Sequence, residues 1–490
     1  NRTNFRRTAD TSNRVMVEYS SPNTNKPLHF GHMRNIFLGA AVSEIIKADG
    51  NEVIKANLIN DRGVHICKSM LAWQLNANGA TPQTAGIKGD HMVGDYYVRF
   101  NDDLKKEIAP ALQSIFTDGV IPANIPAKDV AKIEAIQRDI ALLKEQQTAA
   151  TQKIDAIKLA ALGADATNSV NDAIAGNRKW KKVPDCFESN ETLPAEKKEK
   201  NQKSLRSLVK ALIELEEKIE EKNDAIKDVV INNTQLMRDA QEMLRKWEAG
   251  DEQTRTLWAT MNGWVYEGFE KTYKRMGITF DKMYYESNTY LLGKQLVEEG
   301  LKKGVLFRKE DGSVWIDLKA DGLDEKLLLR GDGTSVYITQ DMGTARLKYD
   351  DFQLNQSIYV IADEQNYHMQ VLRLIMQKLG EPCADGIYHL SYGMVELPSG
   401  RMKSREGTVV DADDMIDEMV RLAREQTEQA AKTGGLSATE LDELYEMIGL
   451  GALKFYLLRV EPRKKMIFNP AESIDLKGYT ATFIQYAHAR

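Results

Sequence analysis

The sequence has few cysteines, no long apolar run and no strong excess of charge of one sign. Its three cysteines, Cys67, Cys186 and Cys383, lack C-x-x-C spacing, which argues against a disulfide framework and against a cysteine-rich zinc site. No apolar stretch reaches the length of a membrane span, and the N-terminus has no charged-then-apolar signal pattern. These absences predict a cytoplasmic protein without membrane association, and no protein-bound metal is expected.

The composition fits a folded protein with more than one domain. The chain has 490 residues, of which 42% are hydrophobic, and its formal net charge is −6. This length predicts two or three domains. The mild acidity does not suggest a nucleic-acid coat protein, although a local basic surface is enough to bind RNA. The chain starts without Met and ends inside a predicted helix, so both ends are expected to be boundaries within a longer protein.

Strand and helix patterns alternate over residues 13–100. The predicted strands 15–19 and 52–59 precede predicted helices over 33–47 and 64–76. This alternation favours a parallel sheet that binds ligands at the carboxyl ends of its strands.

Residues 125–235 break this alternation, because apolar residues there recur at alternating spacings of three and four. Such spacing predicts a long antiparallel hairpin of helices over 131–158 and 204–229, each about 40 Å long. Two interpretations stay open: a decoration without catalytic role, or an arm that contacts RNA or a partner through basic residues of its connection. The seam residues are Ile133, Ile136, Ile140, Leu143, Ile154 and Ile157, then Leu205, Leu208, Leu212, Leu215, Ile219 and Ile226; the connection contains Arg178, Lys179, Trp180, Lys181 and Lys182.

The predicted fold class is α/β: a Rossmann-like doubly wound parallel sheet with an inserted long helical hairpin and a C-terminal helical segment. Later strands are predicted at 337–339, 357–361 and 386–390, and a short hairpin at 304–307 and 314–317. The predicted domains are the first half of the nucleotide-binding fold (1–100), the inserted hairpin (101–235), the second half of that fold (236–410) and the helical segment (411–490).

The most informative stretch is His29-Phe30-Gly31-His32, between the first predicted strand and the first predicted helix. Gly31 lets a base or ribose approach the backbone closely, because glycine has no Cβ. The N-terminus of the following helix favours phosphate, and the two imidazoles can donate hydrogen bonds to phosphate oxygens as charge develops on them. This context predicts a nucleotide site.

A basic loop far downstream is the candidate second half of this site. Residues 400–407 read Gly-Arg-Met-Lys-Ser-Arg-Glu-Gly, with three cations in five residues between two glycines. Taken alone, the loop is better explained as a solvated basic turn. Its order after the histidine motif resembles a class I aminoacyl-tRNA synthetase, whose late loop reads K-M-S-K-S.

Acidic and aromatic residues follow the predicted strands of the sheet. Glu18 ends the first strand, and Tyr337 and Asp341 lie around another. Two carboxylates and a phenol suit a cationic substrate with many donors, such as a guanidinium. For Asp341 alone, an N-cap of a helix beginning at Met342 is an equal alternative.

Longer stretches resemble arginyl-tRNA synthetases over most of the chain outside residues 101–235. They include Val17 to His32, Leu244 to Asp251, Asn262 to Phe269, Tyr284 to Ser287, Tyr337 to Asp341, Gly393 to Glu396, Arg405 to Val410 and Gln485 to Arg490. The resemblance implies an enzyme, an arginine–tRNA ligase, that acts on L-arginine, ATP with Mg²⁺ and the tRNA for arginine. A monomer is expected. It also implies that most of the anticodon-binding domain and an N-terminal domain lie outside this chain.

The same resemblance implies roles for individual residues. Arginine would be bound by Glu18, Tyr337 and Asp341 through its side chain and by Asn23 and Gln365 through its α-groups. ATP would be bound by His29, Gly31, His32, His368, Met402, Lys403 and Ser404. The second lysine of the family's loop is missing here, and Lys26, Lys403 or Arg405 would supply its charge. His29 and His32 would stabilise the transition state.

Two rival interpretations have different consequences. A smaller nucleotidyltransferase shares H-x-G-H, but the length of the chain and the late basic loop disfavour it. A non-catalytic RNA-binding relative would keep the fold, but the intact histidines and carboxylates argue against it. The family's Gly-Asp-Trp-Gly after the second strand is here Asn60-Asp61-Arg62-Gly63, which leaves the adenosine and tRNA-end contacts open.

Overall fold

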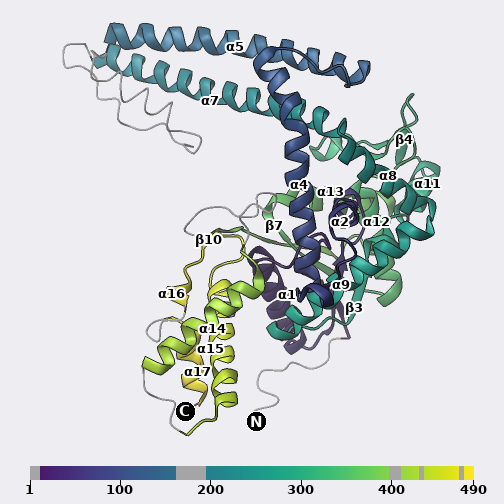
Figure 1. Ribbon diagram of the computed structural model, residues 1–490, viewed down its shortest axis with the longest axis vertical. Helices are drawn as coiled ribbons and strands as arrows, with labels where there is room; N and C mark the ends of the chain where they lie inside the picture. Colours follow the sequence, from purple (N-terminus) through teal and green to yellow (C-terminus); the bar gives the residue numbers. More distant parts are fainter. Residues whose placement is uncertain (1–11, 162–194, 397–409, 430–434, 474–478, 490) are drawn as a thin grey trace. The chain divides into compact units, whose positions relative to one another are not determined.

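The computed structural model describes residues 12–161, 195–396, 410–429, 435–473 and 479–489 (Figure 1). Two compact units make up the chain. The first contains residues 1–101 and 240–490, and the second contains residues 102–239.

A five-stranded sheet forms the centre of the first unit, with every neighbouring pair parallel. Its order is β3-β2-β1-β7-β8, so the chain leaves β1 in both directions. Ligands of such doubly wound sheets bind at this switch point, beyond the carboxyl ends of the strands. The predicted α/β class with a doubly wound parallel sheet is confirmed. The strands are β1 Arg14–Glu18, β2 Glu52–Ile59, β3 Lys282–Tyr285, β7 Gln356–Ala362 and β8 Ile387–Tyr392.

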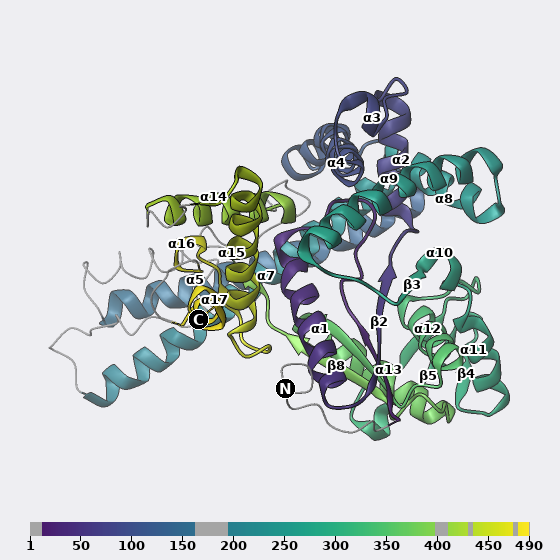
Figure 2. The same cartoon turned by 90° about the horizontal axis from the view of Figure 1, so that it is seen from below.

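Helices pack around this sheet, and α1 (Phe30–Ala48) runs along it in contact with β1, β2 and β7 (Figure 2). The side of α1 that faces the sheet is apolar and fully buried, with Met33, Ile36 and Phe37 at most 2% exposed. The other helices of this unit are α2 Val64–Asn76, α3 Pro82–Ala85, α9 Glu252–Met276, α10 Glu286–Thr289, α11 Gly293–Lys302, α12 Tyr337–Phe352, α13 Asn366–Leu379, α14 Ala412–Gln429, α15 Ala438–Leu458, α16 Pro470–Ser473 and α17 Ala481–Ala489, with 3₁₀ turns η2 Lys319–Asp321 and η3 Asp363–Gln365.

Two small sheets complete the first unit. An antiparallel sheet has the order β4-β5-β6 and packs into the same core as α11, α12 and α13. A second pair, β9 and β10, is parallel. Among the described residues, no helix combines the length and the apolar character needed to cross a membrane. The strands are β4 Leu306–Arg308, β5 Val314–Ile316, β6 Lys326–Leu329, β9 Val395–Glu396 and β10 Met466–Ile467.

The strand predicted at 337–339 is wrong, because these residues form the first turn of α12. Val336 is extended and is the N-cap residue, and Thr339 donates its hydroxyl to the Leu328 carbonyl at 2.6 Å. Of the residues that suggested a strand, Ile338 and Thr339 are instead buried against β6, whereas Tyr337 is exposed. Asp341 therefore lies inside the helix and is not its N-cap.

Two long helices dominate the second unit. They are α5 (Ala127–Ala161) and α7 (Ala195–Asn232), which pack side by side (Figure 1). The pairs Lys222–Asp139 and Gln147–Glu216 progress in opposite directions along the two helices, so the helices are antiparallel. The unit also contains the π-turn η1 (Ser114–Asp118), while α4 (Gly89–Gln113) and α8 (Gln235–Ala249) include the residues at which the two units join.

An isoleucine-rich cluster holds the base of this pair together. Ile133, Ile136 and Ile140 of α5 pack with Ile226 and Val229 of α7. Ile154 and Leu212 are also buried, which fits a seam of alternating three and four residues. The basic connection, residues 178–182, lies outside the described residues.

Candidate active site

A sharp turn follows β1 and carries the chain over the carboxyl end of the sheet. Ser20 and Ser21 have φ angles of 73° and 43°, which are unfavourable for residues other than glycine. Two asparagines hold the turn by accepting backbone hydrogen bonds: Asn35 from Ser20 at 2.6 Å and Asn57 from Ser21 at 3.0 Å. Such strain of about 1–3 kcal/mol per residue persists only where surrounding contacts impose it.

The histidine motif opens α1 at this switch point. His29 is the extended N-cap residue, and its backbone N–H donates to Nδ1 of His32 at 3.1 Å. The two rings lie 3.7 Å apart between centroids. A Cβ at Gly31 would lie 3.0 Å from the His29 ring, so this position favours glycine.

Both imidazoles are neutral at neutral pH. Burial, reinforced by the Lys26 charge, lowers the pKa of His29 to about 3. Burial also lowers the pKa of His32, with a further contribution from His29. Because Nδ1 of His32 accepts a hydrogen bond, its ring proton is on Nε2, which leaves Nε2–H as a donor.

The segment after the predicted basic loop pairs with this motif. Phe30 donates its backbone N–H to Val410 at 2.9 Å, and Ala412 donates to Leu28 at 3.0 Å. These hydrogen bonds fix the downstream end of the loop beside the histidines. Met402, Lys403, Ser404 and Arg405 themselves lie outside the described residues.

Helix α12 carries Tyr337, Asp341 and Lys348 at spacings of four and seven, which places them along one face. Asp341 lies 2.6 Å from Nε2 of His368, a residue that was predicted to bind ATP. Glu18, at the end of β1, forms an ion pair with Lys348. Both predicted arginine-binding carboxylates therefore already have a nitrogen partner.

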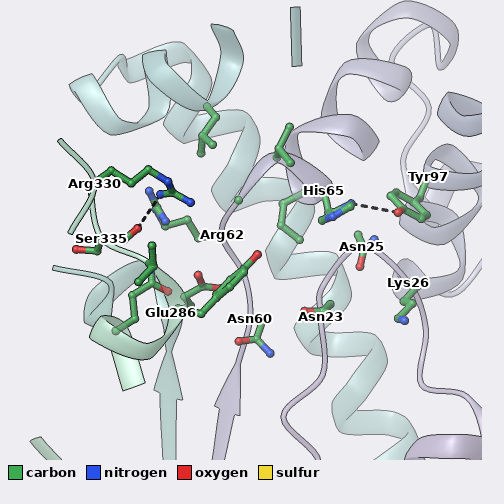
Figure 3. Close-up of a pocket in the computed structure, with 17 residues that line it drawn as sticks. Asn23, Asn25, Lys26, Asn60, Arg62, His65, Tyr97, Glu286, Arg330 and Ser335 are labelled. Atoms are coloured by element: carbon green, nitrogen blue, oxygen red, sulfur yellow. Dashed lines mark hydrogen bonds between the residues drawn. The ribbon is translucent and has the colours of Figure 1, made fainter. Parts of the chain in front are cut away.

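A cavity of about 680 Å³ opens beside the carboxyl ends of β1 and β2 (Figure 3). Of the predicted site residues, Asn23, Lys26 and Tyr337 line it, and the Tyr337 side chain is exposed. Glu18 and Asp341 are not among the lining residues, and Gln365 lies exposed on η3. A second cavity of about 240 Å³ is lined by Lys26, His29 and Asp411, among others.

Sequence reasoning missed three charged residues that line the larger cavity: Arg62, Arg330 and Glu286. In Figure 3 they lie on the wall opposite His65 and Tyr97. The Arg62 guanidinium lies 3.9 Å from the centroid of the Tyr290 ring and forms an ion pair with Glu248. The sequence did contain a signal for Glu286, because this residue lies in the stretch 284–287 that resembles arginyl-tRNA synthetases.

Glu286 gives the cavity a pH dependence. Burial raises its pKa to about 7, and the neighbouring carboxylates Asp61 and Asp341 reinforce this shift against Arg62. An acid whose pKa is raised on folding stabilises the fold below its ordinary value of 4.5, and this stabilisation is lost as the pH rises through 7.

The unmutated chain should therefore lose stability between pH 5 and pH 8, and Glu286→Gln should not show this loss. The free energy of unfolding of the variant minus that of the unmutated chain should be about 2 kcal/mol larger at pH 8 than at pH 5, which means that the variant is relatively more stable at the higher pH. Denaturant titrations at the two pH values measure this. The exposed Glu298→Gln on α11 is the control; an equal response of the two variants would contradict the assignment.

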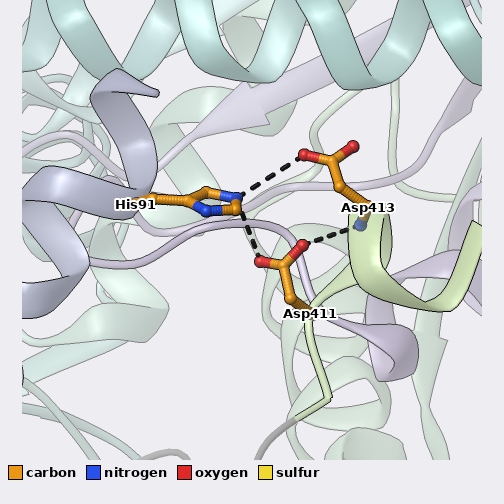
Figure 4. A group of neighbouring side chains, drawn as sticks. All are labelled: His91, Asp411 and Asp413. Carbon is orange, nitrogen blue, oxygen red and sulfur yellow. Dashed lines mark hydrogen bonds and ion pairs between the residues drawn. The ribbon is translucent and has the colours of Figure 1, made fainter. Parts of the chain in front are cut away.

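A second polar cluster ties α4 to the start of α14 (Figure 4). Single ligand atoms of His91, Asp411 and Asp413 lie within 4.8 Å of one another, as a metal site requires. However, Asp413 already accepts from Lys88 at 2.6 Å. The Asp413 carboxylate, which lies 3.5 Å from Nε2 of His91, raises the pKa of His91. Burial opposes the ionised form of Asp413, but its contacts with His91 and Lys88 lower its pKa. The cluster thus behaves as an ion-pair network.

The parallel sheet with the histidine motif at its switch point is the arrangement typical of class I, Rossmann-like α/β folds. The family model described as "tRNA synthetases class I (R), catalytic domain" matches residues 1–111 and 192–469. The chain therefore belongs to the family of class I tRNA synthetases (R).

Curated relatives are similar over nearly the whole chain. An arginine–tRNA ligase of Bacteroides thetaiotaomicron is 46% identical over 481 residues, which cover 98% of this chain and 62% of the relative. One of Parabacteroides distasonis is 47% identical over 476 residues, covering 97% of this chain and 62% of the relative. The chain thus spans 62% of the length of these relatives.

Solved structures support the same fold. The arginyl-tRNA synthetase of Thermus thermophilus matches with a TM-score of 0.62 and 19% identity, covering 99% of this chain and 65% of that one. The arginyl-tRNA synthetase of Plasmodium falciparum matches with a TM-score of 0.57 and 14% identity, covering 98% of this chain and 58% of that one.

Proposed function

We propose that this chain activates L-arginine with MgATP and transfers the arginyl group to the 3′ end of the tRNA for arginine. The observation that carries the proposal is the position of two carboxylates: Glu18 ends β1, the strand that leads into the histidine motif, and Asp341 lies on α12, where both act on the charge of Lys348. A site for a cation would then lie beside a site for phosphate.

The proposed roles follow from chemistry at each position. Glu18, Tyr337 and Asp341 bind the guanidinium, whose planar fork of donors matches carboxylate acceptors. Asn23 and Gln365 hold the α-amino and carboxylate groups. His29, Gly31, His32 and His368, with Met402, Lys403 and Ser404, bind ATP. The loop lacks the family's second lysine, and Lys26, Lys403 or Arg405 supplies its positive charge.

In the first step the arginine carboxylate attacks the α-phosphate of ATP, and pyrophosphate leaves. In the second step a ribose hydroxyl of the tRNA attacks the carbonyl of the adenylate, and AMP leaves. Substitution at phosphorus needs position and charge stabilisation more than a protein nucleophile. Neutral imidazoles contribute as hydrogen-bond donors to the charge that develops on phosphate oxygens.

Exchange of labelled pyrophosphate into ATP tests this function. We expect exchange that requires L-arginine and is stimulated by the tRNA. Exchange driven by a phosphate ester in place of arginine would support a smaller nucleotidyltransferase. Binding of tRNA without any exchange would support a non-catalytic RNA-binding relative. We propose a monomer that works in the cytoplasm, where these substrates meet during protein synthesis.

We propose that residues 101–235 are an inserted domain without catalytic role. Removing residues 148–215 and joining the ends with a short glycine–serine linker should leave tRNA charging unchanged. This cut is chosen because it keeps the hydrogen-bonded level of Gln147 and Glu216 and the isoleucine cluster beneath it. Aminoacylation kinetics with arginine-specific tRNA measure the outcome.

A longer deletion serves as the comparison for this experiment. Removing residues 131–229 also removes Ile133, Ile136 and Ile140, which should destabilise the second unit. A loss of charging by the shorter deletion, in a protein with unchanged thermal stability and unchanged pyrophosphate exchange, would show instead that the arm contacts RNA.

A further inference from the structure

Lys348 is a fully buried lysine that the proposed mechanism does not use. It is 1% exposed, on the face of α12 that also carries Tyr337 and Asp341. Its ammonium forms an ion pair with Glu18, which is itself only 6% exposed. Lysine is almost never fully buried without a partner, and here one partner is a proposed arginine ligand.

Aromatic rings complete the surroundings of this ammonium. Nζ of Lys348 lies 4.4 Å from the centroid of the Tyr359 ring on β7 and 6.0 Å from that of Tyr284 on β3. Both distances are within the range of cation–π attraction. Although burial disfavours the ammonium, the Glu18 charge raises the pKa of Lys348, followed by Tyr359 and Asp341. The lysine is therefore charged and held at a fixed place.

We propose that Lys348 is a positioning residue for arginine recognition, holding the Glu18 carboxylate oriented for the substrate guanidinium. This inference rests on the proposed function, because it takes Glu18 as a ligand of arginine. A carboxylate has about four lone-pair sites, so Glu18 has acceptor capacity for a cation on each side. Lys348 would occupy one side permanently, and the substrate would occupy the other.

Without Lys348, Glu18 would be a buried carboxylate with no cation beside it. A buried carboxylate without a cation takes up a proton, and a protonated carboxyl group attracts a guanidinium far less. Other titratable groups around this pair do not replace Lys348. Tyr359 is neutral because burial raises its pKa to about 12, and Tyr284 donates its hydroxyl to Asp351 at 2.9 Å. Asp341 adds negative charge from the same helix and lies against His368.

The test is the affinity for L-arginine, measured by calorimetry between pH 6 and pH 8.5. In Lys348→Met, affinity should fall about tenfold or more across this range, because the buried Glu18 loses the cation that holds it. Lys348→Arg, which keeps a cation beside Glu18, should retain clearly more affinity than Lys348→Met. Lys378→Met, which removes a half-buried lysine paired with Asp321, is the matched control. The titration of Glu286 is common to all these variants and cancels in the comparison.

A purely structural ion pair gives a different result. Lys348→Met would then lower the thermal midpoint while leaving arginine affinity and its pH profile unchanged, which would overturn the inference. If this variant does not fold, Glu18→Gln combined with Lys348→Met decides, because removing both partners leaves no unpaired buried charge. The double variant should bind arginine as Glu18→Gln alone does. A further loss would show that Lys348 does not act through Glu18, and would also overturn the inference.

Two other results would show that the proposed function is wrong, and not only the role of Lys348. If the unmutated chain does not bind arginine, or if Glu18→Gln binds it as tightly as the unmutated chain, the pocket assignment itself is wrong. If Glu18→Gln weakens binding and Lys348→Met does not, only the role of Lys348 is wrong.

Discussion

Replacing Asp341 by alanine is expected to weaken the binding of L-arginine by about 2–4 kcal/mol, or roughly 30- to 900-fold. The carboxylate lies on α12, one turn after Tyr337, and contacts Nε2 of His368 at 2.6 Å. Its removal would leave the substrate guanidinium without one charged partner in a partly buried site. Calorimetric titration with arginine measures the change.

Asp341→Asn separates charge from hydrogen bonding at the same position. The amide can still bond to His368 but carries no charge, so we expect it to lose nearly as much affinity as alanine. Asp350→Asn, at an exposed position of the same helix, is the control and should bind arginine normally. A change of less than about threefold for Asp341→Ala would rule out its assignment as a ligand.

The fold could be predicted from sequence where local pattern and global arrangement agree. Alternating strand and helix signals before residue 100 predict a parallel sheet, and the structure has one. The apolar spacing in α5 and α7 reflects a real packing surface, since Ile133 and Ile226 are fully buried in one cluster. Each of these features repeats over several turns or strands, so single substitutions do not hide it.

The start of α12 could not be predicted in this way. Residues 337–339 have β-forming side chains, and the N-cap residue is Val336 rather than Ser, Thr, Asp or Asn. The helix is fixed there by tertiary contacts, including the Thr339 hydroxyl bond to β6. Because such contacts join distant segments, no local rule reveals them.

The partners of the candidate site residues were also beyond local patterns. Glu18 and Lys348 are 330 positions apart, and they meet only because β1 and α12 converge at the switch point of the sheet. The resemblance to a family assigned a role to Glu18 but none to Lys348. Likewise, the raised pKa of Glu286 follows from burial beside Asp61 and Asp341, which the sequence does not show.

His32→Ala is expected to slow adenylate formation about a hundredfold while the affinity for ATP changes little. Nδ1 of His32 accepts from the His29 backbone, so Nε2–H is the group that can donate to a phosphate oxygen. A donor of this kind contributes most when charge develops in the transition state. Single-turnover rates of adenylate formation and ATP titrations separate the two effects.

Two further substitutions identify which nitrogen of His32 acts. Glutamine places an amide donor near the position of Nε2, whereas asparagine places its amide near Nδ1, so His32→Gln should recover part of the rate and His32→Asn should resemble alanine. Because burial lowers the pKa of this imidazole, its contribution should not titrate between pH 6 and pH 8. If the whole loss in His32→Ala lies in ATP affinity, the residue only binds the ground state. His29, which is also neutral and lies beside the loop end at Val410, would then be the only imidazole of the motif that stabilises the transition state.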